Sequence, residues 1–110
     1  LFKYELGRYE EAIVDYNEAI RLKPDFAKAF TNRGAVKQEL GRYEEAIVDY
    51  NEVIRLKPDL AEAFSNRGLV KYKLGRYEEA IVDYNEAIRL KPDYAEAFTN
   101  LGAVKKGLGR

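Results

Sequence analysis

A repeat with a period of 34 residues constrains this chain more than any other feature of its sequence. Two kinds of residue keep that spacing: Gly7, Gly41, Gly75 and Gly109, and Pro24, Pro58 and Pro92. The segment GRYEEAIVDYNEAIRLKP, which begins at Gly7, recurs unchanged from Gly75, and the copy that begins at Gly41 differs only at Val53. Self-similarity at this length is typical of a solenoid of stacked units rather than of a single globule.

Each unit is expected to contain two helices. In its second half the apolar side chains fall on one helical face, at Tyr43, Ala46, Ile47, Tyr50, Val53 and Ile54. We expect this helix to end just before Pro58, because proline disfavours a helical conformation at the residue that precedes it. The first helix of the unit, Ala27 to Leu40, is expected to end at Gly41, since glycine adopts the left-handed conformation that closes a helix.

The sequence also predicts how the first helices begin. Asp59 and Glu62 have the spacing of a capping box, in which the aspartate accepts hydrogen bonds from the first turn of the helix. Asp93 and Glu96 repeat that spacing one unit later. We therefore expect both aspartates to cap helices.

Glycines within the first helices indicate close packing. A glycine inside a helix costs about 1 kcal/mol relative to alanine, which is best explained if the partner helix passes very near. Such glycines recur at Gly34, Gly68 and Gly102. The small residues expected opposite them are Ala12, Ala46 and Ala80.

Composition narrows the range of functions. The 110 residues include no His and no Cys, which removes imidazole bases, thiolate nucleophiles and most zinc ligand sets, so we expect neither an enzyme nor a bound cofactor or metal. Lys and Arg, 19 in all, balance 19 Asp and Glu, so no net charge attracts nucleic acid or an anionic membrane surface. No apolar run approaches the roughly 18 to 20 residues of a membrane-spanning helix. The absence of cysteine fits a cytoplasmic location.

The repeating residues resemble the tetratricopeptide repeat (TPR) family. One unit carries the family's pattern at Phe30, Gly34, Leu40, Gly41, Tyr43, Ala46, Tyr50, Val53 and Pro58. The next unit repeats it at Phe64, Gly68, Leu74, Gly75, Tyr77, Ala80, Tyr84, Ala87 and Pro92. The sequence departs from the family where leucine is usual, at Arg33 and Arg67. Either these guanidinium groups pair with Asp49 and Asp83, or they extend to solvent.

The resemblance implies an all-α fold, a TPR α-solenoid in which antiparallel helix pairs form a right-handed superhelix. The whole chain, 1–110, would be a single TPR array. Its parts would be a partial repeat (1–26), two full repeats (27–60 and 61–94) and the first helix of a further repeat (95–110). Within the partial repeat, residues 1–6 would be the end of a first helix and Tyr9 to Leu22 a second helix.

The first helices differ between units more than the second helices do. The differences form a stripe that the resemblance places on the concave surface. Beside it runs an invariant row, Asn32, Asn66 and Asn100, hereafter the asparagine row. An amide both donates and accepts hydrogen bonds, so such a row can hold the backbone of an extended peptide. It resembles the asparagine ladder in the TPR region of the O-linked N-acetylglucosamine transferases.

The predicted peptide-binding residues are therefore the asparagine row together with Lys28, Thr31, Ser65, Leu69, Tyr72, Lys73, Thr99 and Lys106. Neutral drift of exposed residues explains the stripe equally well, and the asparagines could be structural or merely solvated. Family members that bind the C-terminal tails of heat-shock chaperones use a fixed set of lysine, asparagine and arginine residues. Here only the asparagine row fits that set. Thr31 and Ala35 stand where its leading lysine and asparagine would be, and its lysine and arginine pair is replaced by Glu62 with Asn66 or by Glu96 with Asn100, which argues against those tails.

Two functions remain. The first is a protein–protein interaction scaffold that binds an extended peptide segment in the concave groove. The second is a self-assembly module, in which copies of the chain stack head to tail through uncapped ends such as the one near Val104 and Leu108.

Overall fold

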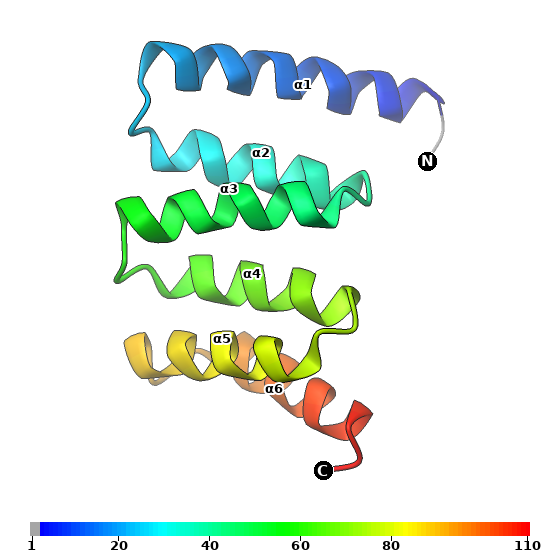
Figure 1. Cartoon of the computed structure of the whole chain (residues 1–110), viewed down its shortest axis with the longest axis vertical. Helices are drawn as coiled ribbons and strands as arrows, with labels where there is room; N and C mark the ends of the chain where they lie inside the picture. Colours follow the sequence, from blue (N-terminus) through cyan, green and yellow to red (C-terminus); the bar gives the residue numbers. More distant parts are fainter. Residues whose placement is uncertain (1–2) are drawn as a thin grey trace.

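The computed structural model describes residues 3–110, with side chains from Glu5 onward. Over these residues the chain folds into six helices and no strand: α1 (Lys3–Leu22), α2 (Ala27–Glu39), α3 (Tyr43–Leu56), α4 (Ala61–Lys73), α5 (Tyr77–Leu90) and α6 (Ala95–Gly107). Each helix packs against the next, so that α1 and α6 lie at opposite ends of a stack that measures 42 × 32 × 20 Å (Figure 1). The all-α solenoid expected from the period is confirmed.

The turn after each even-numbered helix closes as predicted. Gly41, Gly75 and Gly109 have φ values of 76°, 78° and 74°, in the left-handed region that favours glycine. At Gly41 the glycine N–H donates to Gln38 (N···O 3.0 Å), and the Arg42 N–H donates to Lys37 (N···O 2.8 Å). This pair of bonds is the Schellman motif, which satisfies carbonyls that the end of a helix leaves free.

The turns that contain proline correct the capping prediction. The second helix of the unit ends at Leu56, as expected, but α4 begins at Ala61 and its N-cap residue is Leu60, which makes no side-chain capping bond. The Leu60 N–H donates to the Lys57 carbonyl (N···O 3.2 Å), which places Pro58 and Asp59 in the middle of a tight turn. Asp93 likewise lies within a turn, since the Tyr94 N–H donates to the Lys91 carbonyl (N···O 3.0 Å) and Tyr94 is the N-cap residue of α6. Neither aspartate caps a helix, because the proline draws it into the turn.

The first helix also differs from the expectation. Residues 1 and 2 of the predicted helix end lie outside the described residues, but α1 runs without a break through Gly7, whose φ is not positive. The break expected near Gly7 is therefore wrong. At Gly41 the preceding helix, α2, folds back and packs on α3, whereas the described residues before Gly7 are part of α1 itself. Local helix propensity then prevails.

Close packing at the helical glycines is confirmed at two of the three positions. A Cβ on Gly34 would lie 2.9 Å from the Tyr50 ring, and one on Gly68 would lie 3.2 Å from the Tyr84 ring. The Asp83 Cβ lies equally close to the Gly68 position, at 3.2 Å, so the nearest groups are tyrosine rings and this Cβ rather than the predicted alanines, although Ala46 and Ala80 are fully buried. At Gly102 nothing lies within 4 Å, and among the described residues no helix follows α6.

Candidate peptide-binding surface

Helices α2, α4 and α6, which carry every predicted peptide-binding residue, are joined by shared buried clusters. One cluster combines Ala27 of α2, Val53 of α3 and Ala63 of α4. The C-terminal cluster includes Leu101 of α6 and is covered by Phe64 of α4. In Figure 1, α3 passes in front of α2 and α5 in front of α6. Thus α2 and α4 both contribute to the first of these clusters, and α4 and α6 both contribute to the second.

The asparagine row occupies equivalent, half-buried positions on these three helices. Within the part of the chain that the structure describes, none of the three amides makes a side-chain hydrogen bond or an ion pair. Their donors and acceptors are therefore available to a ligand.

The other predicted residues differ in accessibility. Lys28, Thr99 and Lys106 are exposed, and Leu69 is half-buried. Thr31 is half-buried and its hydroxyl already donates to the Ala27 carbonyl (3.1 Å), while Ser65 is buried.

Two predicted residues contact neighbouring rings. Tyr72 packs on the C-terminal cluster, with its ring centroid 5.6 Å from that of Tyr77. The Lys73 ammonium lies 6.0 Å from the centroid of the Tyr43 ring. Both side chains thus have packing contacts in addition to any contact with a ligand.

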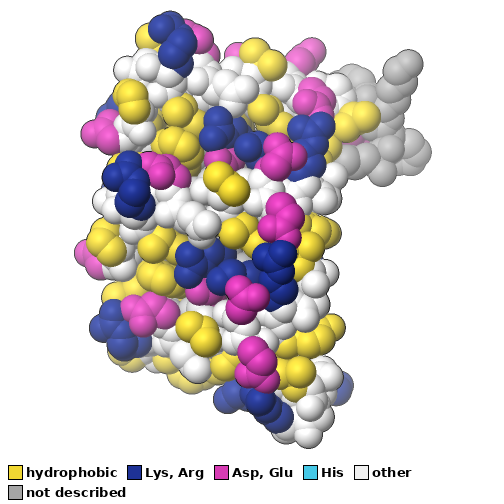
Figure 2. Space-filling view, viewed as in Figure 1, with side chains coloured by type: hydrophobic (Ala, Val, Ile, Leu, Met, Phe, Trp, Pro, Cys, Tyr) yellow, Lys and Arg dark blue, Asp and Glu magenta, His cyan; other side chains and the backbone are white. Residues whose placement is uncertain are grey.

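Charges on the first turns of the even-numbered helices are mixed. Lys28, Glu62 and Glu96 occupy equivalent exposed positions. Glu62 has only a distant partner, the Lys91 ammonium at 4.0 Å. Figure 2 shows the side on which α3 and α5 lie in front of α2 and α6. Over that side basic and acidic side chains are interspersed and no large patch of one sign forms.

A repeated ionic network lies between the helices. The Arg33 guanidinium of α2 donates to both carboxylate oxygens of Asp49 on α3 (2.9 and 2.6 Å) and to the Asn17 side chain of α1 (2.8 Å). Asp49 is 1% exposed, and the Lys37 ammonium lies 3.3 Å from it. The Asp49 hydrogen bonds are the main reason that the pKa of Arg33 is raised.

The next unit repeats this arrangement. Arg67 bonds to Asp83 (2.9 and 2.7 Å) and to Asn51 (2.9 Å), and the Lys71 ammonium lies 3.2 Å from Asp83. Of the two alternatives for these arginines, pairing with Asp49 and Asp83 is the one that the structure shows. Their role is structural, because each arginine ties three consecutive helices together and neutralises a buried carboxylate that would be costly alone.

Other ion pairs join neighbouring units and were not predicted. Arg42 pairs with Glu10, Arg76 with Glu44, and Arg110 with Glu78. The spacing of 32 residues between partners is the only sequence signal for them. All are largely exposed, so each pair contributes little to stability.

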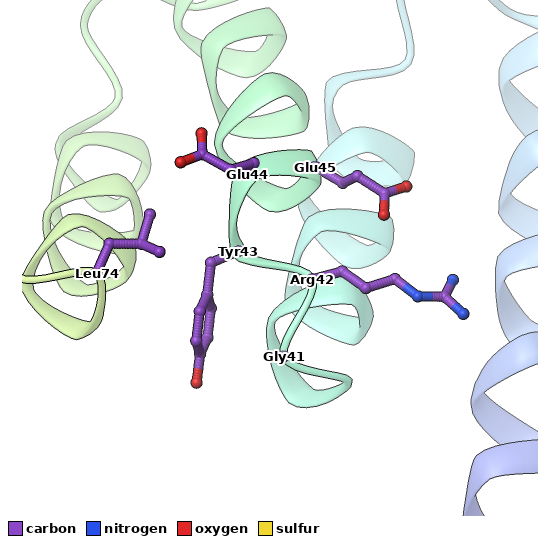
Figure 3. A pocket seen from close by; sticks show the side chains of 6 residues that line it. All are labelled: Gly41, Arg42, Tyr43, Glu44, Glu45 and Leu74. Carbon is purple, nitrogen blue, oxygen red and sulfur yellow. The ribbon is translucent and has the colours of Figure 1, made fainter.

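A small cavity of about 240 Å³ opens at the start of α3 and is lined by Gly41, Arg42, Tyr43, Glu44, Glu45 and Leu74 (Figure 3). In this view the Arg42 side chain extends away from Leu74, toward α1. None of its lining residues is a predicted binding residue. Its mixture of acidic and basic groups indicates no defined ligand.

Residues 3–110 contain no group of three acidic, His or Cys side chains that could hold a metal ion. No helix among them is long and apolar enough to cross a membrane.

The fold and this surface define an all-α repeat protein built from stacked helix hairpins. The sequence model of the TPR repeat matches residues 3–41, 39–75 and 70–109, so each match contains a pair of helices. The chain belongs to the TPR repeat family. No curated protein sequence matches it significantly.

Several solved structures are similar to the chain. The first TPR domain of Spaghetti (RPAP3), bound to the HSP90 peptide SRMEEVD, is 29% identical with a TM-score of 0.88. The match covers 97% of this chain and 85% of that one. The second TPR domain of human RPAP3, in complex with the HSP70 peptide SGPTIEEVD, is 31% identical with a TM-score of 0.84, covering 93% and 85%. MamA is 25% identical with a TM-score of 0.86, covering 97% and 63%. These structures support the TPR repeat in general and do not single out the transferase family.

Proposed function

We propose that the chain is a non-catalytic interaction scaffold that binds an extended peptide segment across α2, α4 and α6. The observation that supports this most strongly is the asparagine row, whose three amides are accessible and have no partners within the described residues. Similar domains of RPAP3 hold chaperone peptides, which adds weight to peptide binding as a class of function.

The ligand we propose is not an acidic chaperone tail. The peptides in the RPAP3 structures end in Glu-Glu-Val-Asp, and cations are what would hold such an end. In this chain Thr31 and Ala35 stand at the leading positions of the tail-binding set, and Glu62 with Asn66, or Glu96 with Asn100, stands where that set has its lysine and arginine pair. We propose instead a peptide recognised through its backbone by the amides, with an apolar side chain placed near Leu69 and Tyr72.

A random peptide library panned on the chain tests this function. Replacing Asn32, Asn66 and Asn100 by alanine should weaken binding of the selected peptides at least about tenfold, because each lost hydrogen bond is worth about 0.5–1.5 kcal/mol. The matched control replaces by alanine the exposed valines Val14, Val48 and Val82, which occupy equivalent positions on the odd-numbered helices, and should bind as the unchanged chain does.

Three results would contradict the proposal. The library could yield no peptide, or the asparagine-row variant could bind the selected peptides as tightly as the control. The third is binding of the peptide SRMEEVD at concentrations below about 1 mM, which would contradict the exclusion of acidic tails.

A second candidate function is head-to-tail self-association, and one observation favours it. Asp15 on α1 is exposed although its equivalents Asp49 and Asp83 are buried, and Gly102 on α6 lies open although Gly34 and Gly68 are covered. Each end of the described stack thus offers one half of an internal helix contact. Sedimentation analysis over a range of concentrations tests it, since an unchanging monomer mass would rule it out.

A further inference from the structure

The charges at the two ends of α2 are the reverse of those at the ends of α4. Lys28 and Glu39 lie in the first and last turns of α2, where α4 has Glu62 and Lys73. All four residues are exposed. The two helices run in the same direction, so that their N-terminal ends lie on the same side of the stack (Figure 1). Equivalent ends of these two helices therefore carry opposite charges.

The arrangement on α2 does not serve the stability of that helix. A helix is stabilised by acidic side chains in its first turn and by basic side chains in its last turn, because of its dipole. Among the six helices of residues 3–110, only α2 has no acidic residue in its first turn. Glu62 and Lys73 agree with the dipole of α4, whereas Lys28 and Glu39 oppose that of α2. The two charges on α2 therefore need another explanation.

Lys28 also lacks the partner that its equivalent has. The Glu62 carboxylate lies 4.0 Å from the Lys91 ammonium, and the residue equivalent to Lys91 in the preceding unit is Lys57. Within the described part of the chain, Lys28, Lys57 and Glu39 make no ion pair. One unit thus sets a carboxylate against a lysine where the other has two lysines. The start of α2 accordingly favours an anionic group from outside the chain.

Both charges lie on the face of α2 that carries Asn32. Lys28 precedes Asn32 by four residues and Glu39 follows it by seven, spacings that return to the same side of a helix. Along the helix axis these spacings correspond to about 6 Å and about 10 Å. An extended peptide that crosses α2 at Asn32 directs its side chains alternately to its two sides, so that one side faces Lys28 and the other faces Glu39.

The similarity of the units creates an ambiguity that these charges remove. The asparagine row offers equivalent amides, and contacts to a peptide backbone provide affinity but no specificity. A peptide could therefore bind in registers that differ by one unit. Because the charges change sign from α2 to α4, a side chain that pairs with Lys28 in one register meets Glu62 in the next.

We propose that the end charges of α2 select an extended peptide of mixed charge and fix its register. An acidic side chain of the peptide pairs with Lys28 and a basic one with Glu39, on opposite sides of the backbone. Where the peptide crosses α4, an acidic side chain pairs with Lys73. This inference rests on the proposed function and names the class of peptide that the surface binds.

Peptides selected from the random library on the unchanged chain provide the test. The double variant Lys28→Glu, Glu39→Lys should bind them at least about tenfold more weakly, because the peptide charges then face like charges. Versions of these peptides with acidic and basic residues exchanged should prefer the double variant to the unchanged chain. The matched control exchanges an exposed ion pair of α1, Glu18→Arg with Arg21→Glu, and should bind the selected peptides as the unchanged chain does.

Two further measurements address folding and register. In urea the double variant should be at least as stable as the unchanged chain, because both new charges agree with the helix dipole. A photo-reactive amino acid placed beside the acidic residue that pairs with Lys28 should cross-link to α2 and to neither α4 nor α6, as mapped by mass spectrometry.

The outcomes separate this inference from the proposed function. Selection of no peptide would contradict both. If the asparagine-row variant loses binding and the double variant does not, the proposed function holds and the selection by charge is wrong. A double variant less stable in urea would show that the two charges serve the fold, and cross-links to more than one even-numbered helix would contradict a single register.

Discussion

The buried tyrosines Tyr50 and Tyr84 occupy equivalent positions in two repeats, but only one of their hydroxyl groups has a hydrogen-bond partner. The Tyr50 hydroxyl donates to the Gln38 side chain (3.1 Å), and both groups belong to the first complete hairpin. In the next hairpin Tyr72 replaces that glutamine, and the buried Tyr84 hydroxyl has no partner. A buried hydroxyl without a hydrogen bond costs free energy that a bonded one does not.

Replacing each tyrosine by phenylalanine should therefore have unequal effects. We expect Tyr50→Phe to lower the free energy of unfolding by about 1 kcal/mol, since it removes a hydrogen bond. We expect Tyr84→Phe to leave it unchanged or to raise it by about 1 kcal/mol, since it removes an unpaired group. Urea unfolding measures both.

A second background serves as the control. Tyr72→Gln supplies the missing acceptor, and in that background Tyr84→Phe should become as costly as Tyr50→Phe. Equal losses from the two single substitutions in the unchanged chain would show that the Tyr84 hydroxyl has a partner after all.

Contacts within one repeat could be predicted from the residues that recur with the period, whereas contacts between repeats could not. The pairing of Arg33 with Asp49 could be anticipated, because a guanidinium group buried between the two helices of a hairpin is costly unless a carboxylate pairs with it. The contribution of Lys37 to the same carboxylate was missed, because a lysine in the last turn of a helix is equally compatible with solvent.

Whole elements depend on their neighbours as well as on local signals, and Gly7 and Gly41 show this. They occupy equivalent positions, yet Gly41 has a φ of 76° in a turn and Gly7 lies within α1. Because α2 packs back on α3, the Gly41 turn is held in place. The described part of α1 has no preceding helix to impose a turn.

Alanine substitution at the two glycines should have opposite effects. Gly41→Ala should lower the free energy of unfolding by about 1–2 kcal/mol, since alanine resists the left-handed conformation. Gly7→Ala should raise it by up to about 1 kcal/mol and increase helix content by circular dichroism, since alanine favours a helix interior. A loss at Gly7 as large as that at Gly41 would mean that the chain turns at both positions.

The helix boundaries reveal which local signals were reliable. Gly41 and Pro58 ended their helices as predicted, because positive φ and a missing N–H are properties of the residue itself. The capping boxes failed, because Asp59 has two competing roles and the adjacent proline decides for the turn.

At the scale of the whole molecule, the sequence predicted the solenoid, while a binding surface on its even-numbered helices stays a prediction. Comparison of the units identified the variable positions, but that comparison cannot distinguish accessible from buried side chains. Ser65 is buried and Thr31 is bonded to its own helix, so the three amides are the part of the predicted site that the geometry supports most directly.

The stability of the whole stack should fall at alkaline pH. Burial, with a smaller contribution from the neighbouring Asp49, raises the pKa of Tyr50 to about 12, and burial likewise raises that of Tyr84 to about 12. In the unfolded chain both ionise near pH 10. Between pH 10 and 12 the folded state thus binds more protons than the unfolded state, so the free energy of unfolding decreases as pH rises.

The effect of each tyrosine is fully present below pH 10 and amounts to at most about 2.7 kcal/mol for a shift of two units. Spectrophotometric titration should show most of the 9 tyrosines ionising near pH 10 and the last ones only as helix content is lost. The control is the double variant Tyr50→Phe, Tyr84→Phe, which changes no other titratable group. Its unfolding free energy should depend less steeply on pH above 10. An equally steep dependence would show that the two buried rings contribute nothing to the alkaline loss.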